Sequence, residues 1–269
     1  MIPLVVLDLD GTVIGADAQV RNCVWEAVNR GREAGMKVSI CTGRPAFGVA
    51  QRIAEKLGPD NPHVFQSGAH IGYPDGRTLE VTALREDDIL ALIRLARETG
   101  ALLELYTPSE LFVGKRTDLA ERHAKLLGAT SIVRDLENVA RNEPVVRAQW
   151  VTPWGDHEPL LEGTPEGIST ATATSPALPG IAFVNLTRYG TSKASAVKQI
   201  AKHLRVPLKD IMAVGDSEND VPMLDVVGHP RVMANGSPAV LARFDRVVPS
   251  VEECGAAEAL DEALELRIG

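Results

Sequence analysis

The chain has 269 residues, of which 45% are hydrophobic and 24% are charged, so it can bury a sizeable core in one large domain or two modest ones. Its formal net charge is −8, and this acidic balance argues against nucleic acid and anionic membranes as partners. It has no run of about 18 apolar residues and no signal-peptide pattern, which predicts a cytoplasmic protein.

Strand and helix patterns alternate over the first 81 residues. Apolar runs predict buried strands, and apolar residues at helical spacing predict amphipathic helices between them. A Tyr-Pro-Asp-Gly turn at residues 73–76 predicts a small hairpin. The predicted strands are residues 2–7, 37–41, 63–66, 68–71 and 78–81, and the predicted helices are residues 20–34 and 46–57.

The pattern changes from about residue 83. Strand candidates follow one another here, and residues 163–180 are rich in Thr, Ser, Ala, Pro and Gly. Neighbouring strands are typical of an α+β region with an antiparallel sheet. The predicted helices are residues 85–99 and 119–127, and the predicted strands are residues 102–106, 111–113, 145–151, 168–174 and 181–186.

Alternation of strands and helices resumes after about residue 187. The predicted helices are residues 191–204, 221–227 and 237–243, and the predicted strands are residues 211–214 and 231–233. We therefore predict an α/β fold with a Rossmann-like parallel-sheet core, formed by residues 1–82 and 188–269, and an inserted α+β domain, residues 83–187.

The three cysteines, Cys23, Cys41 and Cys254, are far apart and form no CxxC pair. This spacing indicates neither a disulfide framework nor a zinc site. We therefore expect reduced, mostly buried thiols. The six histidines are equally scattered and predict no metal cluster.

Two carboxylates, Asp8 and Asp10, stand two residues apart where the first strand ends. Like charges this close disfavour their own ionisation unless a cation compensates them, and carboxylate oxygens suit Mg²⁺. In phosphoryl transfer, one carboxylate can attack the phosphorus atom while a second carboxyl group moves the proton. Asp8 and Asp10 suit these two roles.

Further polar groups stand where a predicted strand ends or a helix begins, the edge at which open α/β sheets bind ligands. Thr42 and Gly43 precede a helix, and a hydroxyl, a close backbone N–H and a helix N-terminus together form a phosphate cradle. Lys193 offers a positive charge to crowded carboxylates and phosphoryl oxygens. Asp216 and Asp220 can complete a metal site. Each group alone has an ordinary structural explanation, and only their combination favours a site.

These groups resemble the four motifs of the haloacid dehalogenase superfamily, in its Cof-type branch, subfamily IIB. The inserted region is similar to that branch's C2 cap. In chain order the motifs are Asp8-Leu9-Asp10-Gly11-Thr12, Thr42-Gly43-Arg44, Lys193 and Gly215-Asp216-Ser217-Glu218-Asn219-Asp220.

For the first three motifs, the resemblance implies that Asp8 is the nucleophile and a Mg²⁺ ligand. It implies that Asp10 is the general acid and base and binds Mg²⁺ through its backbone carbonyl. Thr42 and Lys193 would hold the phosphoryl group. Substrate contacts would extend to Gly43 and Arg44 of the second motif.

For the fourth motif, the resemblance implies that Asp216 is the principal metal ligand after the third core strand. Asp220 would support either the metal or Lys193. Asn219 would touch the phosphate or position the loop. One departure stands outside the motifs, because this chain has Ser67-Gly68-Ala69 where many relatives have Asn-Gly-Ala.

The resemblance implies a Mg²⁺-dependent phosphatase that acts on small phosphorylated metabolites, such as sugar phosphates, through an aspartyl phosphate. Asp10 favours this over a dehalogenase, which needs no acid for a halide leaving group. The alternatives are a phosphomutase or phosphotransferase and a non-catalytic phosphometabolite-binding protein.

Neither the substrate nor the oligomeric state follows from the sequence. Arg147, Gln149, Trp150 and His157 are polar or aromatic residues of the inserted region that could meet a substrate. By type, each is more often an ordinary surface or packing residue.

Overall fold

The chain folds into two compact units, which the computed structural model describes for residues 1–17, 19–175 and 177–266. Unit 1 comprises Met1–Gly43, Arg52–Leu79 and Ser192–Gly269. Unit 2 comprises Arg44–Gln51 and Glu80–Thr191. The bounds predicted for the inserted cap domain, residues 83–187, stay a prediction.

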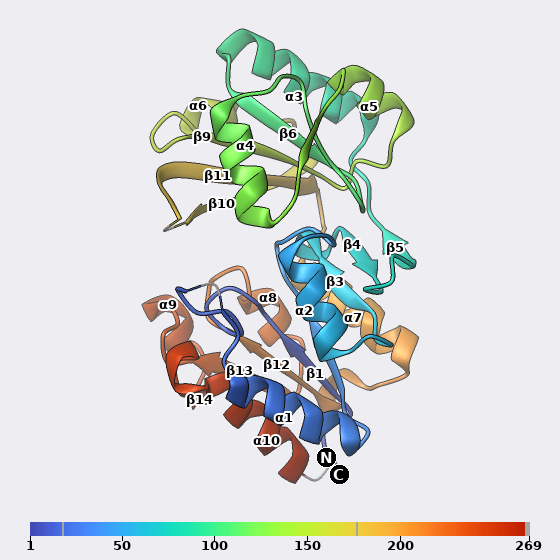
Figure 1. Ribbon diagram of the computed structural model, residues 1–269, viewed down its shortest axis with the longest axis vertical. Coiled ribbons are helices and arrows are strands. Elements are labelled where there is room, and N and C mark those ends of the chain that lie inside the picture. The colour runs from blue at the N-terminus through green and yellow to red at the C-terminus, as the bar shows by residue number, and fades with distance from the viewer. Residues whose placement is uncertain (18, 176, 267–269) are drawn as a thin grey trace. The chain divides into compact units, whose positions relative to one another are not determined.

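The sheet of unit 1 is parallel. Its strands are β1 Leu4–Leu7, β2 Lys37–Ile40, β12 Ile211–Gly215, β13 His229–Met233 and β14 Val247–Val248. They lie in the order β14-β13-β12-β1-β2 (Figure 1). Leu7 lies level with Ile40 on one side and Val214 on the other, and all three are buried, as expected for strands covered on both faces. The predicted Rossmann-like parallel sheet is confirmed.

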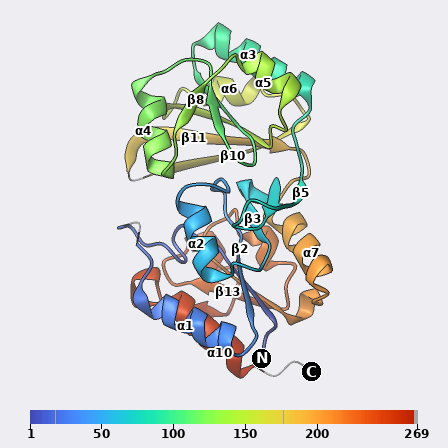
Figure 2. The same ribbon diagram turned by 45° about the vertical axis from the view of Figure 1, so that its right-hand side comes forward.

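Helices pack on this sheet. Those of unit 1 are α1 Asn22–Glu33, α7 Lys193–Leu204, α8 Val221–Leu224, α9 Pro238–Leu241 and α10 Gly255–Glu265, and α2 Val49–Leu57 spans the boundary between the units. Leu4 and Val6 pack with Val197 and Ile200 of α7 on one face. The helix α10 contacts β1 and β12 and lies side by side with α1 (Figure 1, Figure 2). The first and last of these helices are therefore neighbours.

A small sheet follows β2 and α2 along the chain. It consists of β3 His63–Phe65, β4 His70–Gly72 and β5 Thr78–Val81. Cys41 forms a parallel bridge with Val64, and the amide of Thr42 donates to the carbonyl of Val64 at 3.0 Å. The amide of Ser67 in turn donates to the carbonyl of Thr42 at 3.0 Å. These bonds hold the turn after β3 against the end of β2.

The sheet of unit 2 is mostly antiparallel, with β7 and β8 parallel. Its strands are β6 Leu102–Tyr106, β7 Leu111–Val113, β8 Ser131–Val133, β9 Arg147–Pro153, β10 Ile168–Ser175 and β11 Leu178–Arg188. Its helices are α3 Glu86–Thr99, α4 Asp118–Leu127, α5 Leu136–Asn142 and α6 Glu158–Glu162. Leu92 of α3 and Val139 of α5 share a core with Trp150 of β9. The predicted α+β character of the insert is confirmed.

Some predicted elements differ from the structure. The strand β13 begins at His229 rather than residue 231, although Pro230 cannot donate to the ladder. The helices α8 and α9 end earlier than predicted, at Leu224 and Leu241. The sequence patterns missed β8, β14, α5 and α6, which are short, and α10, which begins after Cys254 without a side-chain cap.

The expectation of three reduced thiols is wrong for two cysteines. Cys23 in α1 and Cys254 before α10 form a disulfide, although 231 positions separate them in sequence. Because α1 and α10 lie side by side, the Cα atoms of the two cysteines are 6.3 Å apart, a distance that a disulfide can span. Among the described cysteines Cys41 alone is unpaired, and it is buried.

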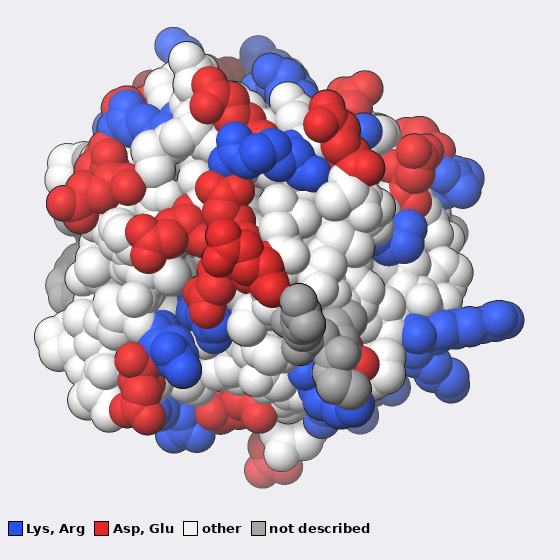
Figure 3. Space-filling model, turned by 90° about the horizontal axis from the view of Figure 1, so that it is seen from below, with Lys and Arg blue, Asp and Glu red and all other residues white. Residues whose placement is uncertain are grey.

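Charges of both signs are mixed on the end of unit 1 that carries the N-terminus (Figure 1). Figure 3 shows acidic side chains gathered near the centre of this face and basic side chains around them. No helix in the part of the chain that the structure describes is long and apolar enough to span a membrane.

Candidate active site

Lys193 lies between two buried carboxylates at the carboxyl end of the sheet of unit 1. Its Nζ donates to Oδ1 of Asp8 and to Oδ1 of Asp220, each at 2.6 Å. The exposed fraction is 5% for Asp8, 3% for Lys193 and 0% for Asp220. A lysine this deeply buried requires such partners.

Strand and helix termini bring these side chains together. Asp8 directly follows β1, and Lys193 is the first residue of α7. A capping box fixes the start of α7, because Ser192 accepts from the amide of Ser195 and the hydroxyl of Ser195 accepts from the amide of Ser192. A positive charge at a helix N-terminus opposes the helix dipole, so Lys193 is held there by its two carboxylates.

Asp220 organises the loop after β12. Its Oδ2 accepts from the amides of Asp216 and Ser217, both at 3.0 Å, and from the Ser217 hydroxyl at 3.1 Å. Its Oδ1 accepts from Lys193. The protein thus engages both oxygens of Asp220, and this suits a residue that positions Lys193 and the loop.

The segment after Asp10 presses against Asp216. Gly11 has φ +84°, and a Cβ there would lie 2.3 Å from Oδ2 of Asp216. The hydroxyl of Thr12 donates to Oδ1 of Asp216 at 3.3 Å. Asn235 holds the same segment, since its Nδ2 donates to the carbonyl of Gly11 at 2.8 Å. Only glycine fits at position 11 without displacing Asp216.

The acids are more numerous than the one lysine can neutralise. Burial raises the pKa of Asp8 well above its usual value, Asp220 adds to this effect and Lys193 opposes it. Burial, with Asp220, also raises the pKa of Asp216 to about 7. Burial lowers the pKa of Lys193, but Asp220 and Asp8 outweigh it, and the pKa of Lys193 lies above its ordinary value. The cluster therefore favours a further positive charge.

The carboxylates fit a divalent metal ion. Asp8, Asp216 and Asp220 each place an oxygen within 4.8 Å of the others. Hard oxygen donors of this kind suit Mg²⁺ or a similar cation, which would supply the missing positive charge. Asp10, the fourth predicted metal residue, lies close enough to raise the pKa of both Asp8 and Asp216.

Thr42 and Gly43 lie at the same edge, because β1 and β2 are paired in parallel and Thr42 is the second residue after β2. Thr42 is 1% exposed. A Cβ on Gly43 would meet Oγ of Ser67 at 3.3 Å. Gln66 and Ser67 both have positive φ, 53° and 55°, which non-glycine residues rarely adopt. Ser67, which stands where many relatives have Asn, thus lies beside the phosphate cradle predicted at Thr42 and Gly43.

A family profile described as haloacid dehalogenase-like hydrolase matches residues 5–260. The chain belongs to this family. The match includes all four motifs, and the predicted assignment to this superfamily, with its hydrolase chemistry, is confirmed.

Relatives of this haloacid dehalogenase-like hydrolase cover nearly its whole length. A Streptococcus pyogenes protein is 27% identical over 271 residues, which are 96% of this chain and 97% of that protein. An HMP-PP phosphatase of Cronobacter sakazakii is 25% identical over 253 residues, which are 92% of this chain and 89% of that protein. A solved structure of a phosphatase of this superfamily from Bacteroides thetaiotaomicron has a TM-score of 0.81 and 26% identity, covering 99% of this chain and 96% of that one.

The structure brings most of the predicted site residues of this hydrolase to one edge of the sheet. Asn219, in the loop after β12, is exposed. Arg44, predicted to contact substrate, begins the segment Arg44–Gln51 of unit 2. The roles of these residues in catalysis stay predictions.

The candidate specificity residues lie in different surroundings within unit 2. Trp150 is fully buried in the core between the sheet and α3, so it packs rather than meeting a substrate. The guanidinium of Arg147 lies 4.0 Å over the ring of Tyr106 and donates to Oδ1 of Asn185 at 2.9 Å. The ring of His157 stands beside that of Trp154.

Thr12, Ser217 and Asn235 also belong to the site, although no separate role was predicted for them. Thr12 and Ser217 lie inside the quoted motifs, and their hydroxyl groups were the available signal. Asn235 follows β13, at the same carboxyl edge of the sheet. All three residues orient the loops that carry the aspartates, a role that only the fold reveals.

Proposed function

We propose that this hydrolase is a Mg²⁺-dependent phosphatase that acts on small phosphorylated metabolites, such as sugar phosphates, through an aspartyl phosphate. The observation that carries the proposal is Lys193 held at 2.6 Å from both Asp8 and Asp220, with Asp216 in the same carboxylate cluster. An aspartate nucleophile needs such fixed positive charge beside it when it approaches a phosphate dianion. The HMP-PP phosphatase among the relatives supports this class of substrate.

Asp8 and Asp10 divide the chemistry. A carboxylate oxygen of Asp8 attacks phosphorus, the bond from phosphorus to the leaving-group oxygen breaks, and Asp10 donates a proton to that oxygen. Asp10 then takes a proton from water, whose oxygen attacks the phosphorus and releases Asp8 and inorganic phosphate. Asp8 is buried while Asp10 is exposed, which suits a shielded nucleophile and a group that exchanges protons with water.

Other groups hold the phosphoryl oxygens. Lys193 stays charged and offsets their negative charge, while the hydroxyl of Thr42 and the amide of Gly43 donate to them. Mg²⁺ held by Asp8, Asp216 and the carbonyl of Asp10 would stabilise the charge that develops on these oxygens. Because its oxygens are already engaged, Asp220 holds Lys193 and the loop.

Hydrolysis of para-nitrophenyl phosphate with and without Mg²⁺ tests the proposal. We expect turnover that requires the metal and falls by at least about 1,000-fold in Asp8→Asn. Asp245→Asn, a change at an exposed aspartate of unit 1, is the matched control and should keep wild-type turnover. Absence of turnover with Mg²⁺, or undiminished turnover in Asp8→Asn, would refute the assigned mechanism.

Acid quenching during turnover tests the intermediate. Mass spectrometry should find one added phosphoryl group on the peptide with Asp8, and none in Asp8→Asn. A panel of sugar phosphates, assayed for released phosphate and for isomerised product, separates a phosphatase from a phosphomutase. Metal-dependent substrate binding without any product would instead indicate a binding protein. The cytoplasm stays the predicted compartment, and cell fractionation tests it.

A further inference from the structure

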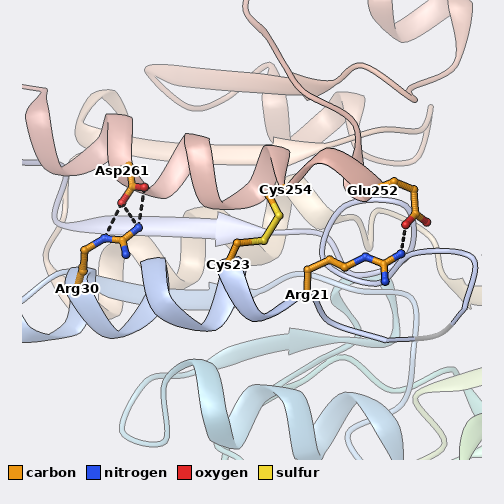
Figure 4. Close-up of a disulfide and its surroundings, with 6 residues drawn as sticks. All are labelled: Arg21, Cys23, Arg30, Glu252, Cys254 and Asp261. Atoms are coloured by element: carbon orange, nitrogen blue, oxygen red, sulfur yellow. Dashed lines mark hydrogen bonds and ion pairs between the residues drawn. A yellow bond between two sulfur atoms is a disulfide. The ribbon is translucent and has the colours of Figure 1, made fainter.

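The disulfide joins the first and last helices of unit 1. Cys23 lies in the first turn of α1 and Cys254 directly before α10 (Figure 4). Ion pairs lie on both sides of the bond, Arg30 with Asp261 on one side and Arg21 with Glu252 on the other (Figure 4). The Arg30 to Asp261 pair is bidentate, with the shortest contact at 2.7 Å.

Contacts run from the bond to the aspartate loop. Glu252, two residues before Cys254, binds Arg21 and accepts from the amide of Ala16 at 3.4 Å. The amide of Val251 donates to Oδ1 of Asn235 at 2.8 Å. Asn235 in turn donates to the carbonyl of Gly11, the residue after Asp10. The turn that ends at Cys254 therefore contacts Ala16 and Arg21 directly, and Gly11 through Asn235.

The backbone at Cys254 also indicates a special position. Cys254 has φ 68° and ψ 29°, the left-handed region that glycine occupies at no cost. A non-glycine residue is strained there and persists when other contacts fix it. The disulfide and the Ser250 to Glu253 capping box are two such contacts.

We propose that Cys23 and Cys254 are a reversible thiol–disulfide pair that sets how firmly Gly11, Ala16 and Arg21 are held, and with it the stability and the turnover of the enzyme. Both residues are partly exposed, so small thiols can reach them, whereas Cys41 is buried. A disulfide in the predicted cytoplasmic compartment is more often a redox-sensing bond than a permanent one. The effect on turnover rests on the proposed function, but the bond and its effect on stability do not.

A low-molecular-weight disulfide such as oxidised glutathione can oxidise the two thiols by thiol–disulfide exchange. The thiolate of one cysteine attacks a sulfur of that disulfide, forming a mixed disulfide and releasing one small thiol. The second cysteine attacks the mixed disulfide at the protein sulfur and releases the other small thiol. The protein loses two electrons and two protons in total, and the small disulfide is reduced to two thiols.

Thiol counting tests the bond directly. Full-length protein, acid-trapped and alkylated in denaturant, should carry one label after equilibration with oxidised glutathione and three after excess reduced glutathione. Cys41→Ala is the matched control, and its counts should fall to none and two. Three labels after the oxidant, or one label after the reductant, would overturn a reversible pair; the second result would indicate a permanent link.

Thermal unfolding and turnover test the consequence. Reduction should lower Tm by roughly 5–10 °C, as expected for the loss of a bond that closes a long loop. The turnover of para-nitrophenyl phosphate should fall about 3–10-fold, since the turn before Cys254 holds Gly11 through Asn235, and Gly11 directly follows the acid Asp10. Cys23→Ser should match the reduced wild type in Tm and turnover, and oxidised glutathione should not raise its Tm.

The wild type under both redox conditions keeps the test valid if Cys23→Ser fails to fold. An equal Tm in the oxidised and reduced wild type would refute the proposal. If no phosphatase turnover exists at all, the thiol count and Tm still decide the redox pair, so the two failures remain distinct.

Discussion

Asp216→Asn should change stability in opposite directions with and without metal. In the metal-free protein the Asp216 carboxylate lies beside Asp8 and Asp220, and burial raises its pKa from 3.8 to about 7. The folded state therefore binds this proton more tightly than the unfolded state does. The resulting stability is fully present below pH 3.8 and is lost as the pH rises through about 7.

The size of the effect follows from the two pKa values. A rise from 3.8 to about 7 is worth about 4 kcal/mol over the whole titration. Between pH 5.5 and pH 8.5 such a group loses about 2 kcal/mol, and solvent screening of the partly exposed side chain leaves about 1–2 kcal/mol. The amide of the variant does not titrate. The unfolding free energy of the wild type minus that of the variant should therefore fall by this amount between pH 5.5 and pH 8.5.

Urea unfolding at both pH values, in EDTA and in Mg²⁺, measures this difference. His63 and His70 also have perturbed pKa values, both about 4, but their titration is common to wild type and variant and cancels. Mg²⁺ at about 100 times its Kd should stabilise the wild type by about 2.7 kcal/mol and the variant by less. Asp245→Asn is the control that should follow the wild type.

Two results would contradict this reasoning. If the difference in unfolding free energy does not depend on pH in EDTA, the folded protein does not raise the pKa of Asp216. If Mg²⁺ stabilises wild type and variant equally, Asp216 is not a metal ligand, and the metal site must be assigned to other residues.

Three further changes test the surroundings of the site. Gly11→Ala places a Cβ 2.3 Å from Asp216 and should lower kcat/KM by about 100-fold in the para-nitrophenyl phosphate assay; a fully active variant would contradict the tight packing. His63 bonds to the Ile40 amide, and burial lowers its pKa from 6.5 to about 4, so the stability it adds is lost as the pH falls through this range. His63→Gln should therefore reduce the loss of unfolding free energy between pH 7.5 and pH 4.5 by about 2.5 kcal/mol, and an unchanged pH profile would refute this assignment. Ser67→Asn should leave unfolding unchanged or stabilise the protein by about 0.5 kcal/mol, because Asn tolerates the φ of 55° better; a loss above about 1 kcal/mol would show that the Ser hydroxyl matters.

The sequence predicted the core strands well because each is buried on both faces and is therefore a continuous apolar run. Helix ends were less predictable. The helix α10 begins after Cys254, whose backbone lies in the left-handed region. No side chain caps this start, so the sequence carries no capping signal for it. The helices α8 and α9 stop early because each is a single short turn between loops.

The site residues could be predicted in type and in order but not in their contacts. Asp8 and Lys193 are 185 positions apart, and only the parallel order of the strands places them at one edge. Spacing alone cannot show that both oxygens of Asp220 are taken by Lys193 and the loop amides. In our proposal that detail decides between the two roles left open for Asp220, because it favours Asp220 as the residue that positions Lys193 and keeps Asp216 as the metal ligand.

The pairing of Cys23 with Cys254 follows from topology rather than from spacing. The helix α1 connects β1 to its neighbour β2, while α10 follows β14 at the far edge and crosses back to contact β12 and β1. This return places the last helix against the first, so cysteines near their N-terminal ends can meet. Cys41 follows β2 inside the core and has no such neighbour among the described cysteines. The same return sets the turn before α10 against Ala16 and, through Asn235, against Gly11, so the redox change that we propose at the helices would act on the neighbour of Asp10 without any contact to substrate.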